Sequence, residues 1–109
     1  MLYLSNNVAI KQTKMHKKEA LGDIMGSRAK IALLRFLSLE KDWQFNLSSI
    51  ARKISLDKGA LSRLIKELES LDVIEVKREG KLLLFRINQK NMIMTSLIIP
   101  FFEKEGRLA

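Results

Sequence analysis

Residues Leu47–Leu68, LSSIARKISLDKGALSRLIKEL, decide the fold of this chain. Within them, apolar residues recur in two sets at the i, i+3, i+4, i+7 spacing that marks one buried face of a helix. The two sets are separated by Ser55-Leu56-Asp57, where the pattern stops. The stretch therefore predicts two short helices joined by a tight turn. The buried positions are Leu47, Ile50, Ala51 and Ile54 in the first helix and Leu61, Leu64, Ile65 and Leu68 in the second.

The outward face of the second helix carries small, hydroxylic and cationic residues and no acidic one. A helix that is held on its partner by one face and presents such groups on the other suits the major groove of DNA. A solvated helix face is the alternative interpretation, in which Lys66 pairs with Glu69 three residues later. The candidate DNA-binding residues of this helix are Lys58, Gly59, Ser62, Arg63 and Lys66.

Two residues at the start of this helix have two interpretations each. Asp57 is placed to cap the free amides of the helix, although its carboxylate would also lie near DNA phosphates. We favour the cap, because its position follows from the apolar periodicity. Gly59 costs about 0.5–1 kcal/mol in a helix relative to alanine. A close approach of the backbone to DNA and a first-turn position with a small penalty explain this glycine equally well.

The residues before this stretch predict a core helix and a very short strand. Ser27 is a suitable N-cap for a helix over residues 28–39, which is apolar around most of its circumference. Residues 43–45 have the length of a very short strand, and Asn46 is placed to cap the helix that follows.

After residue 71 the apolar period changes from that of a helix to that of a strand. Residues 74–77 and 82–87 each alternate between the two faces, and they flank the charged segment Lys77-Arg78-Glu79-Gly80-Lys81. This pattern predicts a β-hairpin, with Gly80 able to adopt a positive φ at its turn. Residues 91–105 then form a strongly apolar helix that should kink or end at Pro100.

Composition limits the class of protein. The 109 residues suit a single domain, and 47% hydrophobic with 29% charged residues is globular composition. The net charge of +8 favours a polyanionic partner, without separating DNA from RNA or a membrane surface. There is no cysteine, the N-terminus lacks the pattern of a signal peptide, and the apolar run 97–102 is too short to span a membrane. We therefore expect a cytoplasmic, nucleoid-associated protein with no membrane partner.

Taken together, these elements resemble a winged helix-turn-helix domain of the ArsR/MarR-like transcription regulator type, over roughly residues 25–105. The resemblance implies a mainly α fold with a small β-hairpin wing (α+β), with extra segments at both termini. It lies in GSRAKIALLRFL (26–37), LSSIARKI (47–54), DKGALSRLIKELESLDVIEV (57–76) and KLLLFRIN (81–88).

Two positions depart from this pattern. Ser55 stands in the turn where the simpler motif usually has glycine, and Asp72 replaces the glycine that is common after the recognition helix. Asp tolerates the left-handed region better than most residues, so the fold can still form.

The resemblance also implies roles for side chains. Ser62 and Arg63 match positions where the family commonly contacts bases and phosphates, whereas Lys58 and Lys66 are expected to hold phosphates. At the wing, Lys77, Arg78 and Lys81 resemble a tip that lies along the backbone or minor groove, although a solvated hairpin end is the alternative and Glu79 argues against deep insertion. Further phosphate contacts are expected from Ser48 or Ser49, Arg52, Lys53 and Lys30.

The apolar C-terminal segment predicts a homodimer. Related regulators use terminal helices to pair, which sets two recognition helices in successive major grooves. We expect an arm or flexible segment over 1–13, a winged helix-turn-helix domain over 14–90 that begins with a short helix at 14–25, and a dimerisation helix and tail over 91–109. The expected interface residues are Met92, Ile93, Met94, Leu97, Ile98, Phe101 and Phe102.

Enzymatic chemistry has little support. His16 is the single histidine and lies in a lysine-rich stretch, and the chain has no phosphate-binding loop or nucleophile motif. We expect no catalytic residues, no metal and no cofactor, while a small-molecule effector remains open. Recognition helix 58–71 and wing 77–81 then predict a sequence-specific regulator that binds double-stranded DNA. The alternatives are a DNA-organising or partition protein with little base readout, and a winged-helix module that binds protein.

Overall fold

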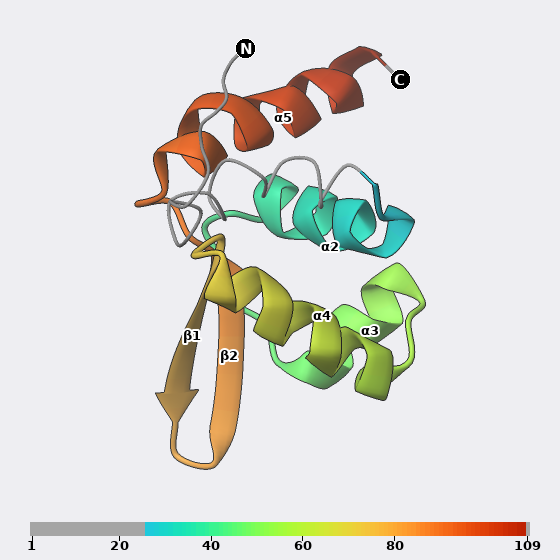
Figure 1. Cartoon of the computed structure of the whole chain (residues 1–109), viewed down its shortest axis with the longest axis vertical. Helices are drawn as coiled ribbons and strands as arrows, with labels where there is room; N and C mark the ends of the chain where they lie inside the picture. The colour runs from blue at the N-terminus through green and yellow to red at the C-terminus, as the bar shows by residue number, and fades with distance from the viewer. Residues whose placement is uncertain (1–25, 109) are drawn as a thin grey trace, which may run out of the picture.

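The computed structural model describes residues 26–108. Three helices come first, a two-stranded antiparallel hairpin follows, and a helical C-terminal segment completes the chain (Figure 1). The elements are α2 (Arg28–Leu39), α3 (Leu47–Ile54), α4 (Lys58–Ser70), β1 (Ile74–Glu79), β2 (Leu82–Ile87), η2 (Met94–Ile98) and α5 (Ile99–Leu108). The helix expected over residues 14–25 and the segment 1–13 lie outside the described residues.

Side-chain caps begin the first three helices, as the sequence predicts. The Ser27 hydroxyl accepts from the amide of Lys30 at 3.2 Å, and the Asn46 side chain accepts from the amide of Ser49 at 2.8 Å. Asp57 accepts from the amide of Ala60 at 2.9 Å. Each bond satisfies one of the free N–H groups that a helix start leaves. The predicted capping role of Asp57 is therefore confirmed.

Two described residues other than glycine have backbone angles in the left-handed region. Ser55 ends α3 at φ 54°, and Asp72 turns the chain after α4 at φ 67°. These are the two positions where the sequence departs from a glycine pattern, and both departures are accommodated without loss of the turn. Gly80 has φ 62° at the hairpin turn, as expected.

The helix-turn-helix and the hairpin share one core. Leu34 and Leu37 of α2, Ile50 of α3 and Leu61 and Leu68 of α4 are all fully buried. The hairpin joins this core through Phe85 and Ile87, which pair across the sheet with Val76 and Ile74. The predicted strand before α3 is reduced to a single bridge between Phe45 and Phe85.

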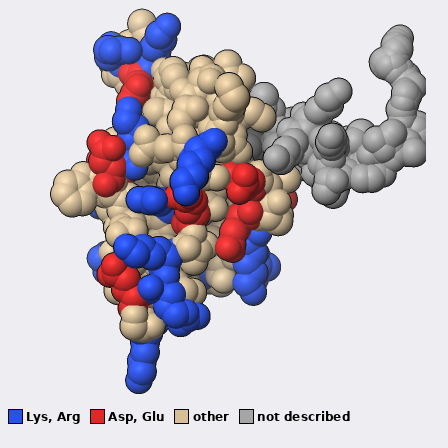
Figure 2. Space-filling model, turned by 90° about the vertical axis from the view of Figure 1, so that its left-hand side faces the viewer, with Lys and Arg blue, Asp and Glu red and all other residues tan. Residues whose placement is uncertain are grey.

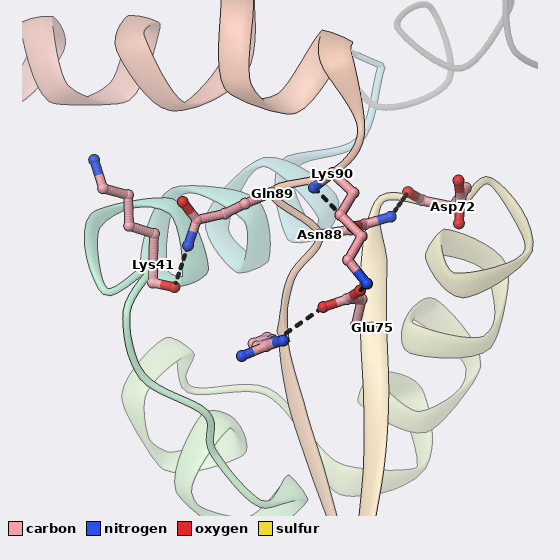
Figure 3. A network of polar contacts seen from close by, with 7 residues as sticks. Lys41, Asp72, Glu75, Asn88, Gln89 and Lys90 are labelled. Carbon is pink, nitrogen blue, oxygen red and sulfur yellow. Dashed lines mark hydrogen bonds and ion pairs between the residues drawn. The ribbon is translucent and has the colours of Figure 1, made fainter.

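A cluster of polar contacts fixes the base of the hairpin (Figure 3). The side chains of Asn88 and Asn91 both donate to the backbone carbonyl of Asp72, each at 2.9 Å. On β1, Glu75 accepts from Arg86 at 2.9 Å and lies 3.7 Å from the Lys90 ammonium group. These contacts hold the hairpin against the end of α4, so the two elements form one rigid surface.

The C-terminal segment lies against α2 at the end of the molecule opposite the hairpin turn (Figure 1). Pro100 neither ends nor interrupts it, because the helix widens just before it into the π-helical turn η2, where the amide of Ile99 donates to the carbonyl of Met94. A π turn shifts the bonding pattern by one residue, which accommodates a proline that lacks an N–H. Two ion pairs fasten α5 to α2 and to the turn that follows it: Arg35 with Glu105 and Lys41 with Glu103, each at 2.8 Å.

Candidate nucleic-acid interface

Helix α4 is held by one face and exposes the other. Leu61, Ile65 and Leu68 are buried against the core. On the opposite face Lys58, Arg63 and Lys66 are exposed, with Ser62 half-buried between them. Within residues 26–108 none of these three cations is paired with a carboxylate. The i+3 pair between Lys66 and Glu69 is not formed, but Glu69 is exposed and lines one groove together with Ser62 and Lys66. The exposed side of α4 is therefore rich in cations but includes one acidic residue at this groove.

The start of α4 is joined to the start of α3. The Lys58 ammonium group donates to the Ser48 hydroxyl at 3.1 Å, so these two candidates lie together at one edge of the face. Gly59 is exposed beside them, and a Cβ there would lie 3.3 Å from the Asp57 carboxylate and 3.9 Å from the Arg63 guanidinium group. The Arg63 group is the end of a flexible side chain, whereas the Asp57 carboxylate is held by its cap bond to the Ala60 amide. A Cβ at this position would therefore crowd the cap, which gives glycine a reason within the described part of the chain.

Helix α3 contributes a second set of polar groups. Arg52 and Lys53 are exposed in its last turn, and Ser48 and Ser49 are half-buried in its first turn. The cations lie at the opposite end of α3 from the contact between Ser48 and Lys58. The structure therefore spreads the α3 candidates along the helix and brings Ser48 alone next to the start of α4.

The wing carries the remaining cations. Lys77, Arg78 and Lys81 are all exposed, and Lys77 is 3.4 Å from Glu79. Figure 2, which views the molecule from the left-hand side of Figure 1, shows basic side chains at its lower end, where Figure 1 places the turn between β1 and β2, while most acidic ones lie higher. Among the described residues Arg78 and Lys81 have no carboxylate partner. The tip is thus a cationic projection beside α4.

Lys30 does not belong to this surface. Its side chain is 10% exposed and its ammonium group is hydrogen-bonded to Glu67 of α4. The expectation of a phosphate contact from Lys30 is corrected: the residue ties α2 to the recognition helix.

A groove between α4 and the hairpin was not anticipated from the sequence. It has a volume of about 410 Å³, and Val76, Leu82, Leu83 and Phe85 line its hairpin side. The sequence feature that could have indicated this groove is the run Leu82-Leu83-Leu84. Successive strand residues face opposite sides of a sheet, and a two-stranded wing cannot bury both of its sides.

The C-terminal segment divides the residues expected at a dimer interface into two groups. Met94, Ile98 and Phe102 are 0%, 7% and 3% exposed, so they belong to the core of one chain, which corrects that part of the expectation. Ile93 is half-buried against the same core. Met92, Leu97 and Phe101 are 74%, 54% and 52% exposed. Met92 precedes η2, Leu97 lies in η2 and Phe101 lies in α5, and these three exposed residues are here called the α5 strip.

Other sites are not evident in the part of the chain that the structure describes. No group of three or more His, Cys, Asp or Glu side chains there could hold a metal ion. None of the helices over residues 26–108 has the length and apolar character needed to cross a membrane. His16 lies outside this range.

The arrangement defines the class: a winged helix-turn-helix, with α3 and α4 as the two helices and β1–β2 as the wing. No family model and no curated protein matches the sequence. Solved structures do match it. HlyU from Vibrio cholerae has a TM-score of 0.65 at 15% identity, over 89% of this chain and 96% of that chain. NolR from Sinorhizobium fredii has a TM-score of 0.65 at 11% identity, over 96% of both chains.

A third similar structure is the homodimeric winged helix-turn-helix DNA-binding domain Mb0332 from Mycobacterium bovis, described as a possible ArsR-family transcriptional regulator. Its TM-score is 0.61 at 16% identity, over 96% of this chain and 89% of that chain. At these identities the likeness concerns the fold, and the resemblance drawn from the sequence is confirmed at that level.

Proposed function

We propose that this chain binds double-stranded DNA as a sequence-specific transcription regulator. The observation that carries the proposal is the exposed face of α4, where Lys58, Arg63 and Lys66 lie without a carboxylate partner among residues 26–108. The mixture of hydroxyl and cationic groups on one helix suits base edges and phosphates at once.

The docking follows from the shape of the surface. Helix α4 would enter the major groove, Ser62 and Arg63 would face base edges, and the wing cations Lys77, Arg78 and Lys81 would lie on the backbone or in the minor groove. Phosphate contacts would come from Lys58, Lys66, Ser48 and Arg52. Because the contacts at the base of the hairpin hold the wing against α4, both elements can engage one duplex without rearrangement.

We further propose that the regulator is a homodimer that pairs through the α5 strip. Large apolar side chains that are half exposed or more, three of them within residues 92–101, favour a partner that covers them. A two-fold pair would present two α4 helices to half-sites one helical turn of DNA apart. In support, one protein of similar fold, Mb0332, is itself described as homodimeric.

The test is a comparison of affinities. Duplexes selected from a random pool and unselected duplexes of equal length are titrated with the full chain by fluorescence anisotropy across a salt series. A regulator should prefer the selected duplex by about 10³-fold or more, and its affinity should fall steeply with salt. A preference near one would instead indicate a DNA-organising protein. Absence of binding to any duplex would refute the proposal and leave the protein-binding module.

A further inference from the structure

Asn91 lies between the DNA-binding elements and the C-terminal segment. The segment becomes helical one residue later, at Met92, which is also the first residue of the α5 strip. On the other side, Asn88 follows the last residue of β2, and its carbonyl accepts from the amide of Asn91 at 3.1 Å. A contact made by the Asn91 side chain therefore acts where the end of the wing meets the start of the proposed pairing surface.

The side chain of Asn91 bonds in two directions. Its Oδ1 atom accepts from the amides of Ile93 at 2.8 Å and Met94 at 3.3 Å, as an N-cap residue does. Its Nδ2 atom donates to the backbone carbonyl of Asp72, just beyond the end of α4, at 2.9 Å. This second bond is here called the Asn91 clamp. In the described chain, the other side-chain hydrogen bonds from residues 91–108 to the rest of the protein go to α2 and the turn after it.

The carbonyl that Asn91 holds belongs to the residue that redirects the chain after α4. Asp72 has φ 67°, a left-handed conformation that residues other than glycine rarely adopt. Its carbonyl also accepts from Nδ2 of Asn88, a residue 5% exposed, at 2.9 Å (Figure 3). A carbonyl oxygen has two lone pairs, so the two side-chain amides use its capacity. Asn88 thus joins the base of the wing to the end of α4, and Asn91 joins the C-terminal segment to the same point.

We propose that Asn91 is a positioning residue that fixes α4 relative to the pairing surface, and so makes the dimer selective for one spacing of DNA half-sites. This inference rests on the proposed function. In a two-fold pair, the separation of the two α4 helices depends on how each is attached to the segment that pairs. The packing of α5 reaches the DNA-binding helices through α2, whereas the Asn91 clamp joins the C-terminal segment to the end of α4 directly.

The geometry of DNA makes this attachment important for spacing. One added base pair moves a half-site by about 3.4 Å along the duplex and turns it by about 35° around the axis. A firmly attached α4 does not follow this displacement, so the pair loses part of its second contact. A loosely attached α4 follows it further and keeps both contacts. The Asn91 clamp therefore acts on the discrimination between spacings and not on the affinity for a single half-site.

Two substitutions remove the clamp and keep the helix cap. Asn91→Asp retains an acceptor for the helix amides but replaces the Nδ2 donor with a carboxylate oxygen that faces the Asp72 carbonyl. Asn91→Ser also caps a helix, is neutral, and lacks the amide that reaches Asp72. The matched control is Gln89→Glu, because Nε2 of Gln89 donates to the carbonyl of Lys41 at 2.9 Å. This control loses an equivalent bond and gains the same charge as Asn91→Asp, but its bond goes to the turn after α2.

The first experiment measures the position of α4 without DNA. The chain has no cysteine, so Lys66→Cys on α4 and Lys104→Cys on α5, both at exposed positions, take spin labels at these two sites alone. Labelled chain is diluted with unlabelled chain, and double electron–electron resonance then reports the distance within one protomer. We expect both Asn91 variants to broaden the distance distribution and Gln89→Glu to leave it unchanged. An unchanged distribution in both Asn91 variants would overturn the proposal.

The second experiment measures the selectivity for spacing. Duplexes that carry two selected half-sites at the best spacing, or with one base pair added or removed, are titrated by fluorescence anisotropy, with a single half-site as the reference. The wild-type chain should prefer the best spacing by about 10-fold or more. Asn91→Asp and Asn91→Ser should reduce this ratio at least about 3-fold and bind the single half-site within about 2-fold of the wild-type chain. Gln89→Glu should keep the wild-type ratio.

The outcomes separate positioning from a general loss of stability. A general loss would weaken every duplex alike and leave the spacing ratio unchanged. That result, an equal effect of Gln89→Glu, or a wild-type chain that binds all spacings equally would overturn the proposal. If the wild-type chain binds no duplex, the proposed function fails, while the resonance measurement still decides whether Asn91 positions α4.

Discussion

The ammonium group of Lys30 is removed from water and held by one carboxylate. Its side chain is 10% exposed, and its partner Glu67 on α4 is 49% exposed. A buried cation costs free energy unless it is paired, so Lys30 depends on Glu67 more than Glu67 depends on Lys30. The pair also joins α2 to α4, and therefore helps to set the angle of the recognition helix.

Glu67→Gln should lower the free energy of unfolding by about 1–3 kcal/mol, because it leaves the Lys30 charge without a counter-ion. Urea denaturation followed by circular dichroism measures the change. Glu69→Gln is the matched control on the same helix, where no carboxylate–ammonium pair is formed within residues 26–108, and it should change stability by less than about 0.5 kcal/mol. Equal effects in the two variants would contradict the role given to Lys30.

Residue roles could be predicted from the sequence where the partner lies a few residues away. Ser27, Asn46 and Asp57 each bond an amide three residues ahead, and such caps follow from where a helix begins. The partners Lys30 and Glu67 are 37 residues apart, and their contact depends on how α2 and α4 cross. No local pattern contains that information, which is why Lys30 was assigned to the DNA surface.

At the scale of elements, α4 and the wing should contribute differently to DNA binding. Arg63 lies on the helix expected to face base edges, whereas Arg78 lies near the wing tip, where the backbone is the expected partner. Arg63→Ala should therefore weaken the selected duplex by about 1–3 kcal/mol and relax the preference at one base pair. Competition against a panel of single-base variants of the selected duplex measures this preference.

Arg78→Ala should weaken selected and unselected duplexes alike and reduce the salt slope by about one unit. Anisotropy titrations over a salt series give the slope. Arg107→Ala, on α5 at the other end of the molecule, is the control and should leave the slope unchanged. A loss of base preference with Arg78→Ala, or none with Arg63→Ala, would contradict the docking.

Helix α5 depends on ion pairs that respond to pH. Arg35 lowers the pKa of the Glu105 carboxyl below its ordinary value of 4.5, first through its hydrogen bond and then through its positive charge. The same bond raises the pKa of Arg35, whose guanidinium group also lies 5.3 Å from the centre of the Phe102 ring. Because the folded-state pKa of Glu105 is depressed, the pair stabilises the fold above pH 4.5, and this contribution disappears as the pH falls through the folded-state value.

Glu105→Gln should therefore lower Tm near neutral pH, and the difference from the wild-type chain should shrink as the pH falls below 4.5. Thermal denaturation at a series of pH values measures it. A gap for Glu105→Gln that persists at the lowest pH would exclude the ion pair as its cause.

The sequence predicted the C-terminal helix but not which of its residues face the core. Apolar residues surround the helix, so their spacing alone does not select a face. The π turn at Met94–Ile98 then rotates the following side chains around the helix axis relative to a regular α-helix. A regular period of 3.6 residues therefore does not predict which way they face. Met94, Ile98 and Phe102 consequently turn inward and Met92, Leu97 and Phe101 turn outward. By contrast, α3 and α4 are regular and capped, and their faces were predicted correctly.

At the scale of the whole molecule, the two proposed surfaces lie far apart. Helix α5 is at one end and the hairpin turn is at the other, with α2 between them (Figure 1). A partner that covered the α5 strip would leave α4, the wing and the groove between them open. Pairing and DNA binding therefore do not compete for surface, and pairing would strengthen binding by placing two α4 helices on one duplex.

Phe101→Asp should disrupt this pair, because it places a charge in the apolar strip and would leave that charge without a partner in the interface. Sedimentation equilibrium should show a dimer for the wild-type chain and a Kd for dimerisation raised at least about 100-fold in the variant. Leu39→Asp is the matched control: Leu39 is 48% exposed against 52% for Phe101, but it lies on α2 outside the strip. The monomeric variant should keep its circular dichroism and bind a single half-site about as well as the wild-type chain, while it loses the additional affinity for a duplex with two half-sites. A Phe101→Asp chain that remains dimeric at micromolar concentration would place the pairing surface elsewhere.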